Sequence, residues 1–240
     1  MADELSNADA MKNEFISSVS HELRTPLTAI RGWAETIRTE RDPVIFKKGI
    51  RVITNETERL SQMVEELLDF SRMQSGHFTL QQSAMDVLAE LGEAALIYAE
   101  RAKIEDITMT YEEPEMLPVV YGDKNRIRQV FINIIDNAIK YSEPSGTIFL
   151  ELSRTPVTVT ASIRDQGRGI AADDLEKVKQ KFFKAKNSVR GSGIGLAVVD
   201  EIVQTLGGRF DIDSTLGQGT TVTVTLPIYH PGQEHLHEKI

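Results

Sequence analysis

The chain has 240 residues, of which 40% are hydrophobic and 26% charged, the composition of a folded globular protein with one or two domains. Its net charge of −9 argues against nucleic acid as a partner, because nucleic-acid binding needs clustered lysine and arginine. The absence of cysteine excludes disulfides, cysteine-based zinc sites and thiol chemistry.

The sequence has no apolar run of 18 residues, and its N-terminus lacks the basic-then-apolar pattern of a signal peptide. We therefore expect no direct membrane contact by this chain.

Two helical patterns come first along the chain. Apolar residues recur every three or four positions over 15–37 and again over 46–67, a rhythm typical of helices packed side by side. Asp42-Pro43 predicts a break between the helices, and Ser75-Gly76 predicts the end of the second. Because a lone hairpin leaves apolar surface uncovered, we expect two copies to form a four-helix bundle in a homodimer. The alternative is that the rest of the chain covers the stripe.

His21 and Pro26 stand inside the first helical pattern, within the stretch SSVSHELRTPLTAIRGW. Proline lacks an N–H, so Pro26 frees the carbonyl oxygen of Glu22 and favours a bend just after His21. We predict that this bend lets His21 meet two different partners.

After residue 76 the sequence alternates between helical and strand patterns. Strands and helices in mixed order, with a hairpin at the end, indicate an α/β sandwich. Asp123 is suited to cap the N-terminus of a helix. We expect helices over 85–102, 123–141 and 195–206, and strands over 107–111, 147–153, 157–164, 209–214 and 220–226.

Two asparagines mark the helix expected over 123–141. Asn133 and Asn137 are four residues apart and so share a helix face, and Lys140 follows on that face. Amide oxygens are hard ligands of the kind that Mg²⁺ accepts beside substrate phosphates. The alternative is that both asparagines face solvent or bond locally.

The stretch DQGRGI follows an expected strand. Asp165 at the strand end is placed to accept a hydrogen bond from an exocyclic amine, and Gly167 and Gly169 permit close backbone approach to a ligand. A plain turn is the alternative reading of this short motif.

The stretch GSGIGLAVV runs directly into an apolar helix. Free N–H groups at a helix N-terminus suit a phosphate, and a basic segment precedes the glycines. The alternative for this stretch is a flexible loop that caps the helix. The stretch Gly217–Thr220 is a hairpin turn, and its alternative reading is a turn without any role in binding. The basic residues are Lys181, Lys184, Lys186 and Arg190.

In order, the chain carries H-E-L-R-T-P-L, N-x-x-x-N-A-x-K-Y, D-x-G-x-G, F-F, G-x-G-x-G-L and G-x-G-T. This series resembles the sensor histidine kinases of two-component systems, and the match runs over residues 11–227. The resemblance implies a signalling-helix leader over 1–10, a dimerisation and phosphotransfer domain over 11–75, a Bergerat-type catalytic ATP-binding domain over 76–228 and a tail over 229–240.

By this resemblance His21 accepts the γ-phosphoryl group of ATP and passes it to an aspartate of a response regulator. Glu22 corresponds to the acidic residue that orients and deprotonates the histidine. Thr25 corresponds to the residue that positions water when the enzyme dephosphorylates its regulator.

The resemblance also implies the nucleotide site. Asp165 would bind the adenine amine, and Asn137, with Asn133 beside it, would hold Mg²⁺. The ATP-binding residues implied are Asn133, Asn137, Lys140, Tyr141, Asp165, Gly167, Gly169, Ile170, Phe183, Arg190, Gly191, Ser192, Gly193, Ile194, Gly195, Leu196 and Thr220.

One departure concerns the phenylalanines, which the family often flanks with arginine and this chain flanks with Lys181 and Lys184. Lysine keeps the charge but loses the bidentate fork, so Lys181, Lys184 or Arg190 is left to contact the γ-phosphate. Two other functions stay open: a non-kinase ATPase of the same superfamily and a nucleotide-responsive scaffold without catalysis. We expect a cytoplasmic fragment of a longer, possibly membrane-anchored sensor.

Overall fold

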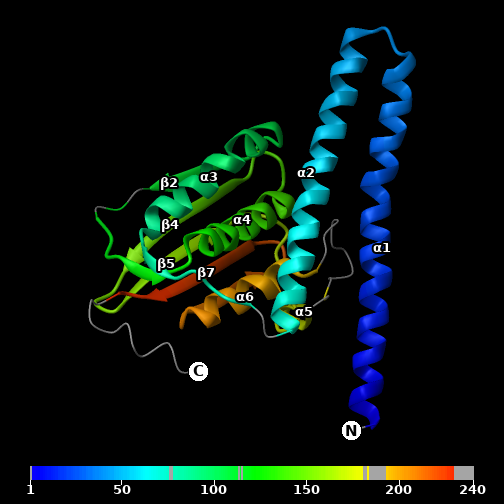
Figure 1. Cartoon of the computed structure of the whole chain (residues 1–240). Coiled ribbons are helices and arrows are strands. Elements are labelled where there is room, and N and C mark those ends of the chain that lie inside the picture. The colour runs from blue at the N-terminus through cyan, green and yellow to red at the C-terminus, as the bar shows by residue number, and fades with distance from the viewer. Residues whose placement is uncertain are drawn as a thin grey trace. The chain divides into compact units, whose positions relative to one another are not determined.

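The computed structural model describes residues 2–75, 78–112, 114, 116–180, 183 and 193–229, and it leaves out the side chains of residues 2–16, 18, 70 and 74. Its elements fall into two compact units, a helical hairpin and an α/β domain (Figure 1). The predicted fold class, a helical hairpin followed by an α/β sandwich, is confirmed.

The hairpin consists of α1 (Ala2–Thr39) and α2 (Pro43–Gln74). The predicted break is confirmed, because Asp42 caps α2 and accepts a 2.8 Å hydrogen bond from the backbone N–H of Val44. Pro43 occupies the first turn, where its missing N–H costs nothing. The helix α1 continues through Pro26 without interruption.

The two helices approach closely near their connection. Gly49 is buried, and a Cβ added there would lie 2.4 Å from Cγ2 of Ile37 and 2.9 Å from the Trp33 ring. A second apolar stripe of the hairpin stays open: Leu27, Phe46, Ile50, Val64 and Leu68 are each between 45% and 54% exposed.

The α/β domain is built on a five-stranded mixed sheet. Its strand order is β2-β4-β5-β7-β6, and β2 pairs with β4 in parallel while the other neighbours are antiparallel. The strands are β2 (Thr108–Glu112), β4 (Thr147–Arg154), β5 (Thr158–Arg164), β6 (Arg209–Thr215) and β7 (Gly219–Pro227).

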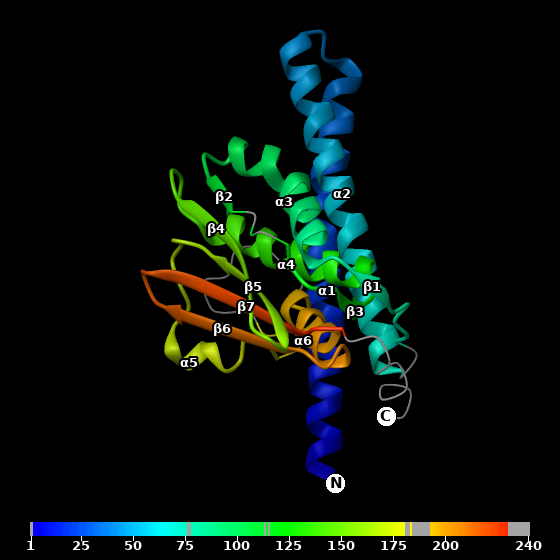
Figure 2. The same cartoon turned by 90° about the vertical axis from the view of Figure 1, so that its left-hand side faces the viewer.

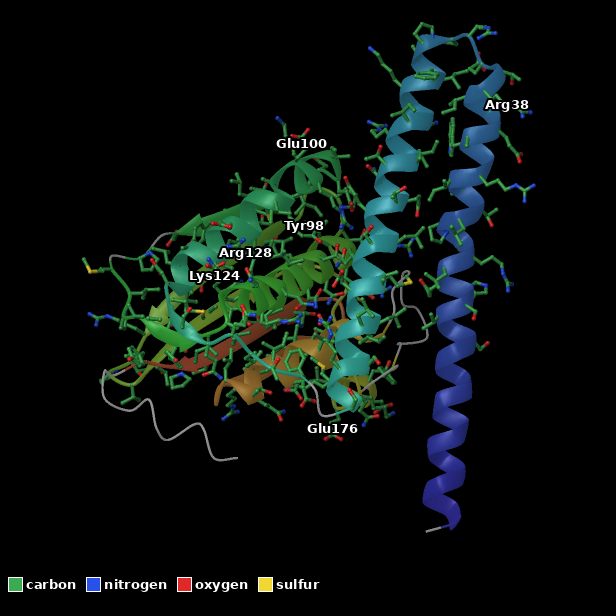
Figure 3. All side chains as sticks on the ribbon, viewed as in Figure 1. Arg38, Tyr98, Glu100, Lys124, Arg128 and Glu176 are labelled. Carbon is green, nitrogen blue, oxygen red and sulfur yellow. The ribbon has the colours of Figure 1, made fainter. Side chains whose placement is uncertain are left out.

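Three helices cover one face of this sheet, namely α3 (Val87–Ile104), α4 (Lys124–Tyr141) and α6 (Gly195–Thr205) (Figures 1 and 2). Between them and the strands lies a core in which Leu91, Phe131, Ile148 and Ile202 have no exposed surface. Figure 3 labels Arg128 of α4, whose guanidinium binds the buried carboxylate of Glu90 on α3 at 2.6 Å.

Helix α4 begins as predicted, because Asp123 accepts hydrogen bonds from the N–H groups of Asn125 and Arg126. The predicted start of the preceding helix at Met85 is wrong. Asp86 caps α3, and Met85 belongs to β1 (Ser83–Met85), which pairs with β3 (Val120–Gly122). The sequence analysis missed this two-stranded sheet and the one-turn helix α5 (Ala172–Leu175). Of the predicted tail, Tyr229 is described, and residues 230–240 lie outside the described chain.

Candidate functional site

His21 lies on α1 with its side chain exposed to solvent. Thr25 follows one turn later, and its hydroxyl donates a 3.4 Å hydrogen bond to the backbone carbonyl of His21. The structure thus brings these two predicted residues onto one stretch of the helix, as their spacing predicts. An accessible imidazole can act as a nucleophile.

Glu22 points toward α2 and meets Arg59. The guanidinium Nη2 of Arg59 donates to Oε2 of Glu22 at 3.3 Å, and its Nη1 lies 3.5 Å from Oε2 of Glu56. Their side chains are 16%, 27% and 19% exposed for Glu22, Arg59 and Glu56. One arginine therefore serves two half-buried carboxylates beside the candidate phosphoacceptor. The sequence analysis did not single out Arg59 or Glu56.

The second group of predicted residues lies in the α/β domain, around Asp165 at the end of β5. Asp165 is 7% exposed, and its Oδ1 accepts from the backbone N–H of Gly167 at 2.8 Å and of Thr220 at 3.1 Å. Its Oδ2 makes no hydrogen bond to any part of the chain that the structure describes. Asp165 therefore keeps one carboxylate oxygen as an acceptor that the described residues do not use.

Burial raises the pKa of the Asp165 carboxyl, because a low-dielectric environment penalises the charged form. The backbone N–H groups of Gly167, Thr220 and Asp165 itself act in the opposite sense and favour the carboxylate. The raised pKa means that burial outweighs these bonds, so the carboxyl protonates more readily than an exposed aspartate.

Both Gly167 and Gly169 lie so close to the backbone of another segment that a side chain would not fit. A Cβ on Gly167 would lie 2.2 Å from the carbonyl oxygen of Tyr141, and one on Gly169 would lie 2.0 Å from the carbonyl oxygen of Thr215. Gly169 also has φ +66, which disfavours other residues. The loop packs between the end of α4 and the β6–β7 turn, so tertiary contacts as well as its own turn fix its conformation.

Tyr141 closes α4 beside this loop, and its carbonyl oxygen accepts from the backbone N–H of Arg168 at 3.2 Å. Two cations flank its ring, the Arg168 guanidinium at 4.5 Å and the Lys140 ammonium at 4.9 Å from the ring centroid. Lys140 and Tyr141 are predicted ligand contacts, and the structure places both at the edge of the aspartate loop. Sequence reasoning missed Arg168.

Ser214 of β6 ties the remaining loop residues together. Its hydroxyl accepts from the backbone N–H of Ile170 at 2.8 Å, donates to the carbonyl oxygen of Gly219 at 2.9 Å and lies 2.9 Å from Oγ1 of Thr220. Ile170 and Thr220 were predicted from the sequence, whereas Ser214 was not. The G-x-G-T turn is therefore joined to the aspartate loop both through Ser214 and through Asp165.

The two asparagines of α4 differ in their surroundings. Asn133 is 5% exposed, and its Nδ2 donates a weak 3.5 Å bond to the carbonyl oxygen of Gly195 at the start of α6. Asn137, one turn further along, is half-buried, and its amide makes no hydrogen bond to the described residues. An uncommitted amide oxygen at a half-buried position suits a hard cation, so Asn137 fits the predicted Mg²⁺ site better than Asn133.

The glycine-rich segment is described in part. Gly193 has φ +72, Ile194 follows it, and Gly195 and Leu196 open α6. The backbone N–H of Phe183 donates to the carbonyl oxygen of Gln180 at 3.3 Å. The predicted phosphate-loop residues Lys181, Phe182, Lys184, Lys186, Arg190, Gly191 and Ser192 lie outside the described residues.

Among the helices that the structure describes, none has the length and apolarity needed to cross a membrane. The described residues also contain no cluster of three or more histidine, aspartate or glutamate side chains placed to hold a metal.

Both parts of the chain match known families. Residues 11–76 match the family described as "His Kinase A (phospho-acceptor) domain". Residues 122–230 match the family described as "Histidine kinase-, DNA gyrase B-, and HSP90-like ATPase". The exposed His21 falls in the first match, and Asn133, Asn137 and Asp165 fall in the second.

Among curated proteins, the circadian input-output histidine kinase CikA of Synechococcus elongatus is 33% identical over 233 residues, which cover 92% of this chain. The sensor protein SrrB of Staphylococcus aureus is 33% identical over 229 residues. The chain spans 30% of the length of CikA and 39% of that of SrrB.

Two solved structures share the fold. The histidine kinase AdeS of Acinetobacter baumannii has a TM-score of 0.65 and 28% identity, over 88% of this chain and 98% of AdeS. Full-length ShkA, solved in complex with AMPPNP, has a TM-score of 0.66 and 27% identity, over 90% of this chain and 46% of ShkA.

Proposed function

Because the chain belongs to the sensor histidine kinase family, we propose that it transfers the γ-phosphoryl group of ATP to His21 and then to an aspartate of a response regulator. One observation carries the proposal. An exposed histidine on a helical hairpin shares a chain with a domain that presents a buried, half-satisfied aspartate to a ligand. The domain boundaries expected from the sequence and the roles of the individual residues are part of the proposal.

In the first step a ring nitrogen of His21 attacks the γ-phosphorus of ATP in line with the leaving group. A P–N bond forms, the bond from phosphorus to the β–γ bridging oxygen breaks, and ADP leaves. The proton on the other ring nitrogen would go to Glu22, the next residue along the chain. In the second step the P–N bond breaks and the phosphoryl group passes to a carboxylate oxygen of the regulator.

The nucleotide would bind in the α/β domain with its adenine amine on Oδ2 of Asp165. ShkA, a structural relative, was solved with AMPPNP, an ATP analogue, which supports a nucleotide here. Tyr141, Ile170 and Thr220 lie at the same loop and would contact the nucleotide, and Lys140 would bind a phosphate. Asn137, aided by Asn133, would hold Mg²⁺, which neutralises phosphate charge when bound.

We also propose that the enzyme dephosphorylates its regulator, with Thr25 positioning the attacking water. Pro26 is one residue away and removes a backbone hydrogen bond from α1. Replacing Pro26 with alanine should change the ratio of kinase to phosphatase activity more than it changes ATP affinity. Equal losses of both activities and of ATP affinity would contradict this role of Pro26.

The active form would be a homodimer joined through the hairpins. Leu27, Phe46, Ile50, Val64 and Leu68 leave an apolar stripe about half exposed, and α2 carries four of these side chains at helical spacing. A second hairpin with the same stripe would cover it, because two hairpins close a four-helix core. A cytoplasmic location stays a prediction.

The proposal is tested by incubating the protein with Mg²⁺ and γ-labelled ATP, followed by treatment with acid or alkali. A phosphohistidine loses its label in acid and keeps it in alkali. We expect such a label on the wild-type protein and on His77→Gln, a histidine variant outside the motif, and no label on His21→Gln. A wild-type protein that binds ATP and carries no label would overturn the kinase proposal in favour of an ATPase or a scaffold.

A further inference from the structure

Arg59 of α2 is the cation that the hairpin brings to the acidic neighbour of His21. Its Nη2 binds Oε2 of Glu22 at 3.3 Å across the two helices. Glu22 is 16% exposed and Arg59 is 27% exposed, so water screens this pair less than it screens a surface pair. We infer that Arg59 is a positioning residue for phosphoryl transfer, which fixes the Glu22 carboxylate in the orientation that it needs beside His21.

Glu56 gives this cation a second partner. Its Oε2 lies 3.5 Å from Nη1 of Arg59 and is buried without a hydrogen bond to the described part of the chain. Two carboxylates therefore share one guanidinium, whose fork can face both of them at once. Glu56 in turn fixes the guanidinium from one turn away on the same helix, so the orientation of Glu22 depends on all three side chains.

Arg59 would affect function through the proton transfer from His21 to Glu22. The inference rests on the proposed function, in which Glu22 accepts the proton that His21 gives up. An unanchored glutamate samples several rotamers, whereas a catalytic group acts best when its geometry is fixed in advance. Among the described residues, the charged or titratable groups near Glu22 include Arg59 and Glu56 on α2 and, within two residues on its own helix, His21 and Arg24.

Steady-state kinetics of autophosphorylation test the positioning role. We expect Arg59→Gln to lower kcat about tenfold, a fraction of the full value of a general base, while KM for ATP stays unchanged. Arg59→Lys keeps the charge, so it should regain part of kcat. Arg51→Gln, the matched exposed arginine of α2, should behave like the wild type.

A double-mutant cycle separates this role from a structural one. If Arg59 acts through Glu22, Arg59→Gln has no further effect on kcat in a Glu22→Gln background. The variant Glu56→Gln/Arg59→Gln removes the carboxylate that Arg59→Gln leaves without its cation, and it should show the same loss of kcat with restored thermal stability. An equal loss in both backgrounds, or a loss that disappears when stability returns, would overturn the inference.

A measurement without ATP keeps this inference separate from the kinase proposal. Diethyl pyrocarbonate modifies neutral imidazole, and mass spectrometry of the peptide that contains His21 gives the rate in the full chain. At a fixed pH we expect this rate to shift by about twofold or more in Arg59→Gln, because the Glu22 carboxylate no longer keeps its orientation beside His21. Unchanged values in Arg59→Gln and Arg51→Gln would overturn the inference even if His21 carries phosphate. A shift without any phosphate label would instead overturn only the kinase proposal.

Discussion

The α/β domain and the helical hairpin bury their apolar residues to very different extents. In the α/β domain, Phe131, Ile134, Leu150 and Val224 are each exposed by 1% or less. In the hairpin, Phe46 and Ile50 are each 45% exposed, although both belong to the apolar pattern over 46–67 that predicted the second helix. The first unit closes its own core, and the second does not.

This difference suggests separate energetic roles for the two units. Burying a large aliphatic side chain contributes about 1.5–3 kcal/mol, so covering the exposed stripe of the hairpin would favour association. The hairpin would bury this stripe against a second copy, whereas the apolar core of the α/β domain lies within one chain. Changes in one unit should therefore leave the function of the other unit intact.

The largest effect is expected from a charge in the open stripe of the hairpin. Ile50→Asp removes an apolar side chain from each proposed half of the dimer and buries a carboxylate in its place. The dimer dissociation constant should rise by at least about a hundredfold, which corresponds to the loss of two buried aliphatic side chains. Analytical ultracentrifugation measures this change.

The matched control is Asn55→Asp, which adds the same charge to an exposed position of α2. It should stay dimeric. Nucleotide affinity should be unchanged in both variants, since Asp165 and its loop lie in the other unit. An Ile50→Asp protein that remains a dimer would refute the proposed role of the stripe.

A smaller effect is expected from Asp165→Asn, which should weaken nucleotide binding and leave dimerisation unchanged. Because Oδ1 must accept from the N–H groups of Gly167 and Thr220, the new amide would turn its NH₂ toward the ligand. It would then face the adenine amine donor to donor. Loss of a hydrogen bond to a charged group costs about 1.5–3 kcal/mol, so the Kd for ADP should rise about 10- to 150-fold by calorimetry.

The hairpin dimer should survive Asp165→Asn unchanged. Asp213→Asn, which removes an exposed charge from β6, should bind ADP like the wild type. Equal affinity of Asp165→Asn and the wild type would show that the nucleotide does not use this carboxylate.

Most of the division into a helical hairpin and an α/β domain could be predicted from the sequence, because local signals and tertiary packing agree along much of the chain. Asp42 and Asp123 announced the starts of α2 and α4, and both cap their helices in the structure. The short pair β1–β3 escaped prediction because each strand has three residues, too few for an alternation to appear.

In the candidate site, the residues that were missed act across elements. Ser214 and Arg59 carry no local motif, and each takes its meaning from a partner far along the chain. Arg59 had a usable signal: Glu22 lies 17 residues before the end of α1 (39 − 22), and Arg59 lies 16 residues after the start of α2 (59 − 43). In an antiparallel hairpin, positions equally far from the connection face each other.

Acid should change the ADP affinity of the α/β domain through the Asp165 carboxyl. Burial raises the pKa of Asp165, and the proposed adenine contact needs the ionised form, so ADP affinity should fall at a higher pH than for an ordinary aspartate. Below that pKa, the wild-type advantage over Asp165→Asn should shrink by up to tenfold per pH unit. Titrating ADP affinity from neutral to acidic pH in both proteins isolates this carboxyl from the phosphates of the ligand.

Folding stability should change in the other direction over the same range. A carboxyl whose pKa is raised by folding stabilises the folded state most below its unfolded pKa, and this contribution is lost as the pH rises through its folded pKa. Relative to Asp165→Asn, the wild-type domain should therefore gain stability on acidification while it loses ADP affinity. Parallel changes in stability and affinity would mean that another group controls the acid response.

The smallest effect is expected at Ser214, which supports the site and does not touch the proposed ligand. Ser214→Ala removes the hydroxyl that accepts from Ile170 N–H and donates to the Gly219 carbonyl, which leaves both without that partner. The α/β domain should lose about 1–3 kcal/mol of unfolding free energy in urea titration, while ADP affinity falls less than tenfold. Ser153→Ala, at an exposed position of β4, should change neither quantity. If Ser214→Ala instead weakened ADP as strongly as Asp165→Asn, the hydroxyl would belong to the ligand contact itself, and the division between a binding aspartate and a supporting serine would be wrong.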